Sequence, residues 1–105
     1  MGYTNYWDQD KEFTEAEWDA VRAEYAYLLE IAGETITDIS EHTEEIVFNG
    51  SGPSCETFVL LKKPTESFNF CKTRRLPYDL PVWHLLTFAY HHTNAVTNLS
   101  RDWSR

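Results

Sequence analysis

The sequence is short of several residue types, and each shortage excludes a class of protein. Of 105 residues only two are cysteine, Cys55 and Cys71, which is too few for a disulfide framework and is typical of a reducing cytosol. No apolar run approaches the roughly 20 residues of a membrane helix, and the first residues do not read as a signal peptide. We therefore expect a cytoplasmic protein without a membrane partner.

Basic residues are also scarce, with nine Lys and Arg against 17 Asp and Glu and a net charge of −8. Binding to a long nucleic acid requires a broad basic face, so this composition argues against it. The four histidines, at positions 42, 84, 91 and 92, lack the spacing of a helical zinc motif, and no Cys-x-x-Cys pair is present. We expect neither a metal site nor another cofactor.

The few basic residues are unevenly placed. Residues 1–60 hold fourteen acidic and two basic groups, whereas residues 61–105 hold three acidic and seven basic groups. Five of the nine cations fall within fourteen positions, namely Lys62, Lys63, Lys72, Arg74 and Arg75. A localised basic segment on an acidic chain predicts either one small anionic ligand or the acidic patch of a partner.

Length and apolar content predict a single domain over residues 1–105. Hydrophobic residues make up 42 % of the chain and aromatic residues 15 %, which suffices for one core without cross-links. There is no repeat and no linker. Because so many residues are aromatic, we expect a homo-oligomer, in which a pocket could be assembled between subunits.

Local patterns predict a helix over residues 15–32. Thr14 and Glu17 have the spacing of a capping box, and Phe13 and Trp18 have that of a hydrophobic staple. A second helix is predicted over 82–92, with Asp79 as its cap and Pro81 in its first turn.

Runs of β-branched and aromatic residues predict strands near 2–7, 36–39, 45–48, 56–62, 68–72 and 95–100. The short connections favour an antiparallel meander of hairpins. The order β-α-β-β-β-β-α-β predicts an α+β fold, a mainly antiparallel sheet with two helices packed on one face as a two-layer sandwich.

Residues 70–79, Phe-Cys-Lys-Thr-Arg-Arg-Leu-Pro-Tyr-Asp, concentrate chemistry at the predicted strand–loop–helix junction. With Phe68 and Phe70 facing the core, alternation would put Cys71 on the opposite face. Lys72 then ends the strand, and the arginines that follow suit bidentate contact with phosphate or carboxylate. This arrangement predicts an anion cradle; the alternative is that the basic run only neutralises the acidic first helix.

Three further side chains have two interpretations each. Cys71 could be a nucleophile, because neighbouring cations would lower its pKa, or it could be a buried structural cysteine. Glu56 and Asp79 could act as acid and base if they converge. The simpler interpretation is that Asp79 caps the helix and that Glu56 pairs with Arg74 or Arg75.

Five motifs occur in order, at residues 2–7, 48–50, 56–59, 70–73 and 77–79. Together they resemble a family of small proteins, mostly from tailed bacteriophages, with the pattern GYTHYW, FNG, ETFV and FCKTARKPYD. The resemblance implies a viral protein in the host cytoplasm and supplies no activity. The chain departs from the family pattern in three places. It has Asn5 where the family favours His, and Arg-Arg-Leu at 74–76 where the family has Ala-Arg-Lys. Its closing segment, 99–103, also differs.

Three functional hypotheses follow. In the first, the chain binds a small phosphorylated ligand without converting it; by analogy with small phage proteins, this could be a nucleotide signal of host defence. In this hypothesis Lys72, Arg74 and Arg75 bind the phosphate, Thr73 and Asn49 form hydrogen bonds, and Tyr78 or Trp83 stacks on the base.

The second hypothesis is a small enzyme that acts on a phosphorylated nucleotide through Glu56 or Asp79, with Cys71 as a possible participant. The third is an acidic interaction module that inhibits a host protein through its first helix.

Overall fold

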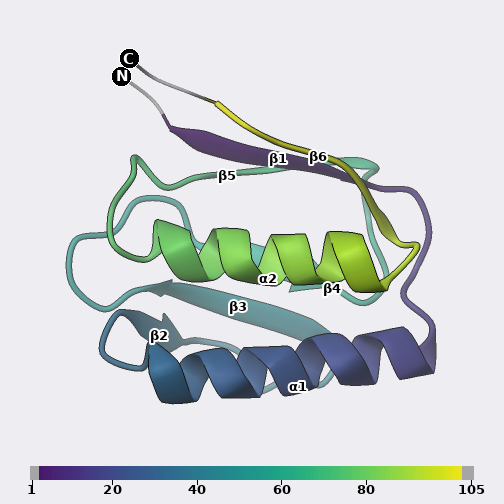
Figure 1. Cartoon of the computed structure of the whole chain (residues 1–105), viewed down its shortest axis with the longest axis horizontal. Coiled ribbons are helices and arrows are strands. Elements are labelled where there is room, and N and C mark those ends of the chain that lie inside the picture. Colours follow the sequence, from purple (N-terminus) through teal and green to yellow (C-terminus); the bar gives the residue numbers. More distant parts are fainter. Residues whose placement is uncertain (1–2, 103–105) are drawn as a thin grey trace.

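The structure is a computed structural model that describes residues 3–102, and its elements follow the predicted order. They are β1 (Thr4–Gln9), α1 (Glu15–Ile31), β2 (Ile36–Asp38), β3 (Glu45–Gly50), β4 (Phe58–Leu61), β5 (Phe68–Lys72), α2 (Asp79–His92) and β6 (Val96–Arg101). The two helices run side by side in opposite directions in front of the strands (Figure 1). The α+β class is therefore confirmed. Within residues 3–102, neither helix has the length and apolar character needed to cross a membrane.

Helix α1 begins where the capping box places it. The Thr14 hydroxyl accepts a hydrogen bond from the Glu17 backbone N–H at 3.1 Å, and the Glu17 carboxylate accepts one from the Thr14 N–H at 2.9 Å. The rings of Phe13 and Trp18 pack with centroids 5.3 Å apart, as the staple predicts. These local contacts fix the start of the helix and leave its apolar stripe to face the core.

The strands form two antiparallel three-stranded sheets, β5-β1-β6 and β2-β3-β4. The predicted hairpin between β4 and β5 is absent, because β4 pairs with β3 whereas β5 pairs with β1. The Gln9 side chain joins the two sheets by donating to the Leu61 carbonyl at 2.8 Å. The central strand β1 thus takes partners that lie far away in the sequence, which local patterns do not specify.

The prediction that Phe68 and Phe70 face the core is wrong. Their exposed fractions are 57 % and 55 %, whereas Cys71 is buried. The register explains this orientation: Asn5 pairs with Cys71, and Tyr6 pairs with Phe70, so the aromatic residues share the outer face. The core instead receives its aromatic rings from other strands, including Phe48 and Phe58, with centroids 5.0 Å apart.

Candidate functional site

The loop that links β5 to α2 is tightly turned and tied to the beginning of β1. The backbone N–H groups of Thr73 and Arg74 both donate to the Tyr3 carbonyl, at 2.9 and 3.1 Å, and that of Leu76 donates to the Thr73 carbonyl at 3.1 Å. Arg74 and Arg75 have φ angles of 57° and 59°, in the left-handed region that costs non-glycine residues roughly 1–2 kcal/mol each. The contacts on both sides hold this strained turn in place.

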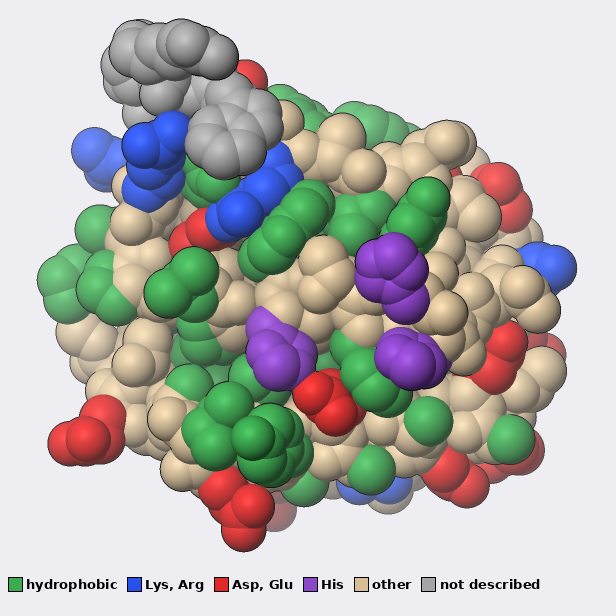
Figure 2. All heavy atoms as spheres, viewed as in Figure 1, with side chains coloured by type: hydrophobic (Ala, Val, Ile, Leu, Met, Phe, Trp, Pro, Cys, Tyr) green, Lys and Arg blue, Asp and Glu red, His purple; other side chains and the backbone are tan. Residues whose placement is uncertain are grey.

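The predicted phosphate-binding cations gather at this loop. Lys72, Arg74 and Arg75 are all exposed, and the Arg75 guanidinium lies over the Tyr3 ring, 4.7 Å from its centroid. Figure 2 shows Lys and Arg side chains together at the upper left, near the beginning of β1. The only ion pair that joins the 62–75 segment to α1 within residues 3–102 is Lys62 with Glu15. Lys62, at the other end of the segment, is therefore the residue that neutralises an acidic group of α1.

Asp79 does not cap α2, contrary to the sequence prediction. The N-cap is Tyr78, which forms no side-chain cap bond. Asp79 is buried and accepts hydrogen bonds from the Asn5 amide at 2.9 Å, from the Thr73 hydroxyl at 2.6 Å and from the Arg101 guanidinium. Arg101 also donates to the Asn5 side-chain oxygen at 3.2 Å. We call these four residues the Asp79 network.

The Asp79 network is structural. Both oxygens of its carboxylate accept hydrogen bonds from the chain, one of them from a cation with which it forms an ion pair, and this disfavours a role as a general base. Sequence reasoning missed Asn5 and Arg101 as members. Their positions, 74 and 22 residues from Asp79, carry no local signal that links them.

The two aromatic residues predicted to stack a base are not presented for it. Tyr78 is 0 % exposed, and its hydroxyl donates to the Glu56 carbonyl at 2.7 Å and accepts the Cys55 N–H at 3.1 Å. Burial raises the pKa of Tyr78 above its ordinary value. The Trp83 ring is half-buried and covered by the Arg101 guanidinium, 4.3 Å from its centroid.

Glu56 and Asn49 also differ from expectation. The Glu56 carboxylate accepts the Lys72 backbone N–H at 2.7 Å, and it forms no ion pair with Arg74 or Arg75 in the described part of the chain. Asn49 lies on β3, where its amide donates to the Thr57 hydroxyl at 3.1 Å. Glu56 therefore borders the cationic loop, whereas Asn49 is held by a different sheet.

Cys71 is a structural residue in this geometry. Removal from water raises the pKa of its thiol to about 12, and the nearby charges of Glu56 and Asp79 act in the same direction. The predicted lowering by adjacent cations is wrong, because the side chain points into the core and away from them. The thiol would be protonated at neutral pH, which does not suit a nucleophile.

A shallow hollow lies on the outer face of sheet β5-β1-β6. It measures about 410 Å³ and is lined by Thr4, Tyr6, Glu56, Phe68, Phe70 and Lys72. Sequence reasoning missed its three aromatic residues as surface groups. The signal was the alternation Phe68-x-Phe70-x-Lys72, which places two rings and a cation on the same side of a strand.

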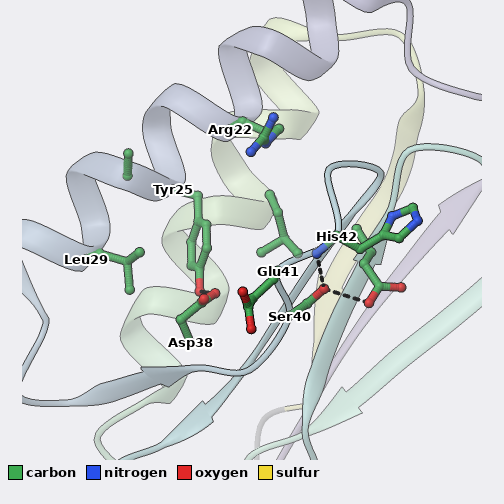
Figure 3. Close-up of a pocket in the computed structure, with 10 residues that line it drawn as sticks. Arg22, Tyr25, Leu29, Asp38, Ser40, Glu41 and His42 are labelled. Atoms are coloured by element: carbon green, nitrogen blue, oxygen red, sulfur yellow. Dashed lines mark hydrogen bonds between the residues drawn. The ribbon is translucent and has the colours of Figure 1, made fainter.

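A second hollow, of about 250 Å³, lies between α1 and the segment after β2 (Figure 3). Its polar groups bond to one another: the Tyr25 hydroxyl donates to Asp38 at 2.5 Å, and the Ser40 hydroxyl donates to Glu45 at 2.7 Å. Three carboxylates line it, those of Asp38, Glu41 and Glu45, against one guanidinium, that of Arg22, so it does not suit an anion. Residues 3–102 contain no group of three or more His, Cys, Asp or Glu side chains able to hold a metal ion.

Four of the five motifs that suggested a phage family meet at Tyr78, whose hydroxyl lies within 3.3 Å of the Glu56 and Lys72 carbonyl oxygens. A side chain at Gly50 would approach the Tyr78 ring to 3.2 Å and the Pro53 carbonyl to 2.7 Å, so only glycine fits there. Gly2 and Trp103, which belong to the first motif and to the closing segment, lie outside the described residues.

Comparisons of the chain with protein-family models, with curated proteins and with solved structures found no match. The family resemblance therefore stays a prediction.

Proposed function

We propose that the chain binds a small phosphorylated ligand of the nucleotide type, without converting it, at the end of β5. The observation that carries the proposal is that Lys72 and Arg74 are exposed and have no carboxylate ion-paired to them within residues 3–102. Two such cations, two positions apart in a chain with 17 acidic groups, provide a local attraction for one anion.

The backbone of the loop supports the same proposal. Glycine adopts positive φ without the cost that other residues incur, yet positions 74 and 75 are both arginine. Strained backbone is concentrated at ligand-binding sites, where the surrounding contacts maintain it. The strained backbone at positions 74 and 75 therefore supports a ligand site at this turn.

Binding is favoured over catalysis because two of the three groups assigned to catalysis, Asp79 and Cys71, are already engaged. The Asp79 carboxylate accepts three hydrogen bonds, and the Cys71 thiol is buried with a raised pKa. From the resemblance to phage proteins we further propose that the ligand is a nucleotide signal of the host's defence, which the protein sequesters in the host cytoplasm.

Calorimetry with a panel of linear and cyclic nucleotides tests the proposal. Lys72→Ala and Arg74→Ala should each weaken binding about tenfold or more, because each removes a charge-assisted contact. Arg22→Ala, which removes an exposed arginine from α1, is the matched control and should bind as the wild type does. The ligand should be recovered unchanged after the protein is denatured.

Two results would reject the proposal. One is that no nucleotide in the panel binds, and the other is that Arg74→Ala has no more effect than Arg22→Ala. Recovery of a chemically altered ligand would favour the enzyme hypothesis instead.

A further inference from the structure

The outer face of sheet β5-β1-β6 exposes aromatic rings where water-facing strand positions are usually polar. Tyr6 of β1 and Phe68 of β5 are stacked with centroids 6.0 Å apart and planes 26° apart, and the ring centroids of Phe68 and Phe70 are also 6.0 Å apart. We call these three residues the aromatic face. Phe68 and Phe70 are both more than half exposed, so burial in the core does not account for their presence.

The aromatic face is continuous with the cationic loop. Lys72 follows Phe70 by two residues on the same side of β5, which places it roughly 7 Å farther along the strand. Both side chains line the hollow of about 410 Å³, a volume within the range of small-molecule sites. A ligand in this hollow would meet flat apolar surfaces first and a positive charge at one end.

We infer that the aromatic face binds the base of a nucleotide, while the phosphate of the same nucleotide reaches Lys72 and Arg74. This inference rests on the proposed function and adds the second half of its ligand. Exposed aromatic side chains on a sheet are a recurrent platform for bases, because every base has a π-face that stacks on a ring. The assignment replaces Tyr78 and Trp83 as the stacking residues.

The polar border of the hollow favours a nucleotide over a second copy of the chain. A second copy laid on the rings would remove the charges of Lys72 and Glu56 from water, and pairing them with the partner's opposite charges offsets that cost only where the geometry is very good. A nucleotide supplies a phosphate for the Lys72 ammonium. The edge of its base supplies N–H donors, which a carboxylate such as that of Glu56 can accept.

The test uses adenosine 5′-monophosphate and, as a base-free probe, ribose 5-phosphate. Phe68→Leu and Phe70→Leu keep an apolar side chain and remove only the ring, so neither exposed substitution should disturb folding. The double variant should bind adenosine 5′-monophosphate roughly 5- to 150-fold more weakly, the usual contribution of a stacked base. Its affinity for ribose 5-phosphate should not change. Tyr90→Leu, which removes an exposed ring from α2, should leave both affinities unchanged.

The outcomes separate this inference from the proposed function. If the double variant binds adenosine 5′-monophosphate as the wild type does, while Lys72→Ala still weakens binding, the phosphate site stands and the base site is overturned. If neither probe binds and the wild type sediments as a dimer that Phe68→Ser dissociates, a second copy covers the face and the inference is overturned. A preference of more than a hundredfold for long single strands over the mononucleotide would also overturn it.

Discussion

Both faces of sheet β5-β1-β6 carry side chains that are unusual for their side, since the inner face buries polar groups beside the core residues Trp7 and Cys71 and the outer face exposes aromatic rings. On the inner face Asn5 and Thr73 are buried, whereas on the outer face Phe68 and Phe70 are largely exposed. Buried polar groups are tolerated when hydrogen bonds satisfy them, and Asp79 and Arg101 do so here. Hydrogen bonds to Asp79 of α2 and Arg101 of β6 therefore explain which residues lie on the inner face. The apolar area of the outer face stays exposed after folding, so folding does not explain it.

The largest effect should come from breaking the inner face at its centre. Asp79→Ala removes the acceptor of three hydrogen bonds and leaves the largely buried Arg101 guanidinium without its carboxylate. We expect a loss of about 3–5 kcal/mol in the free energy of unfolding, measured by urea denaturation. Asp10→Ala removes an exposed carboxylate and should change stability by less than about 0.5 kcal/mol. A loss below about 1 kcal/mol for Asp79→Ala would contradict the role given to the network.

A smaller effect should appear when the inner face is titrated at Cys71. Burial raises the folded pKa to about 12 from an ordinary value of 9.0, so the thiol contributes stability that is present below pH 9 and is lost as pH rises toward 12. Between pH 8 and pH 10.5 the wild type should lose about 2 kcal/mol more than Cys71→Ala does. Denaturant titrations of both proteins at the two pH values measure this difference. Equal losses would mean that the thiol is not desolvated.

The smallest effect on stability should come from the outer face. Phe68→Ala and Phe70→Ala should each lower the free energy of unfolding by at most about 1 kcal/mol, because more than half of each side chain is already in water. Denaturation at several protein concentrations measures the effect and reveals any dependence on association. A loss above about 2 kcal/mol that disappears on dilution would show that the rings are buried between subunits.

Much of the local structure could be predicted from the sequence because its causes are local. The capping box at Thr14 and the staple at Phe13 place the start of α1 correctly, and runs of β-branched and aromatic residues mark each strand to within a few positions. The sequence also located the cationic loop, since the charges of Lys72 and Arg74 are visible without any knowledge of pairing.

The orientation of β5 could not be predicted, because it depends on contacts distant in the sequence. Hydrophobicity alone predicts that the rings of Phe68 and Phe70 face the core. The observed choice instead depends on Asn5, Thr73 and Asp79, whose bonds join three separate segments of the chain. The error in orientation also hid the aromatic face, and with it the residues that we now assign to the base.

The two sheets also differ in when they can form during synthesis. Strands β2, β3 and β4 lie within residues 36–61 and pair with their sequence neighbours, so their sheet can assemble early. Strand β1 is made first, but its partners are β5 and β6, and the last of these ends at Arg101. The strand that carries Tyr6 must therefore wait for β5, which completes the aromatic face. The Asp79 network is completed later, once Arg101 of β6 has been made.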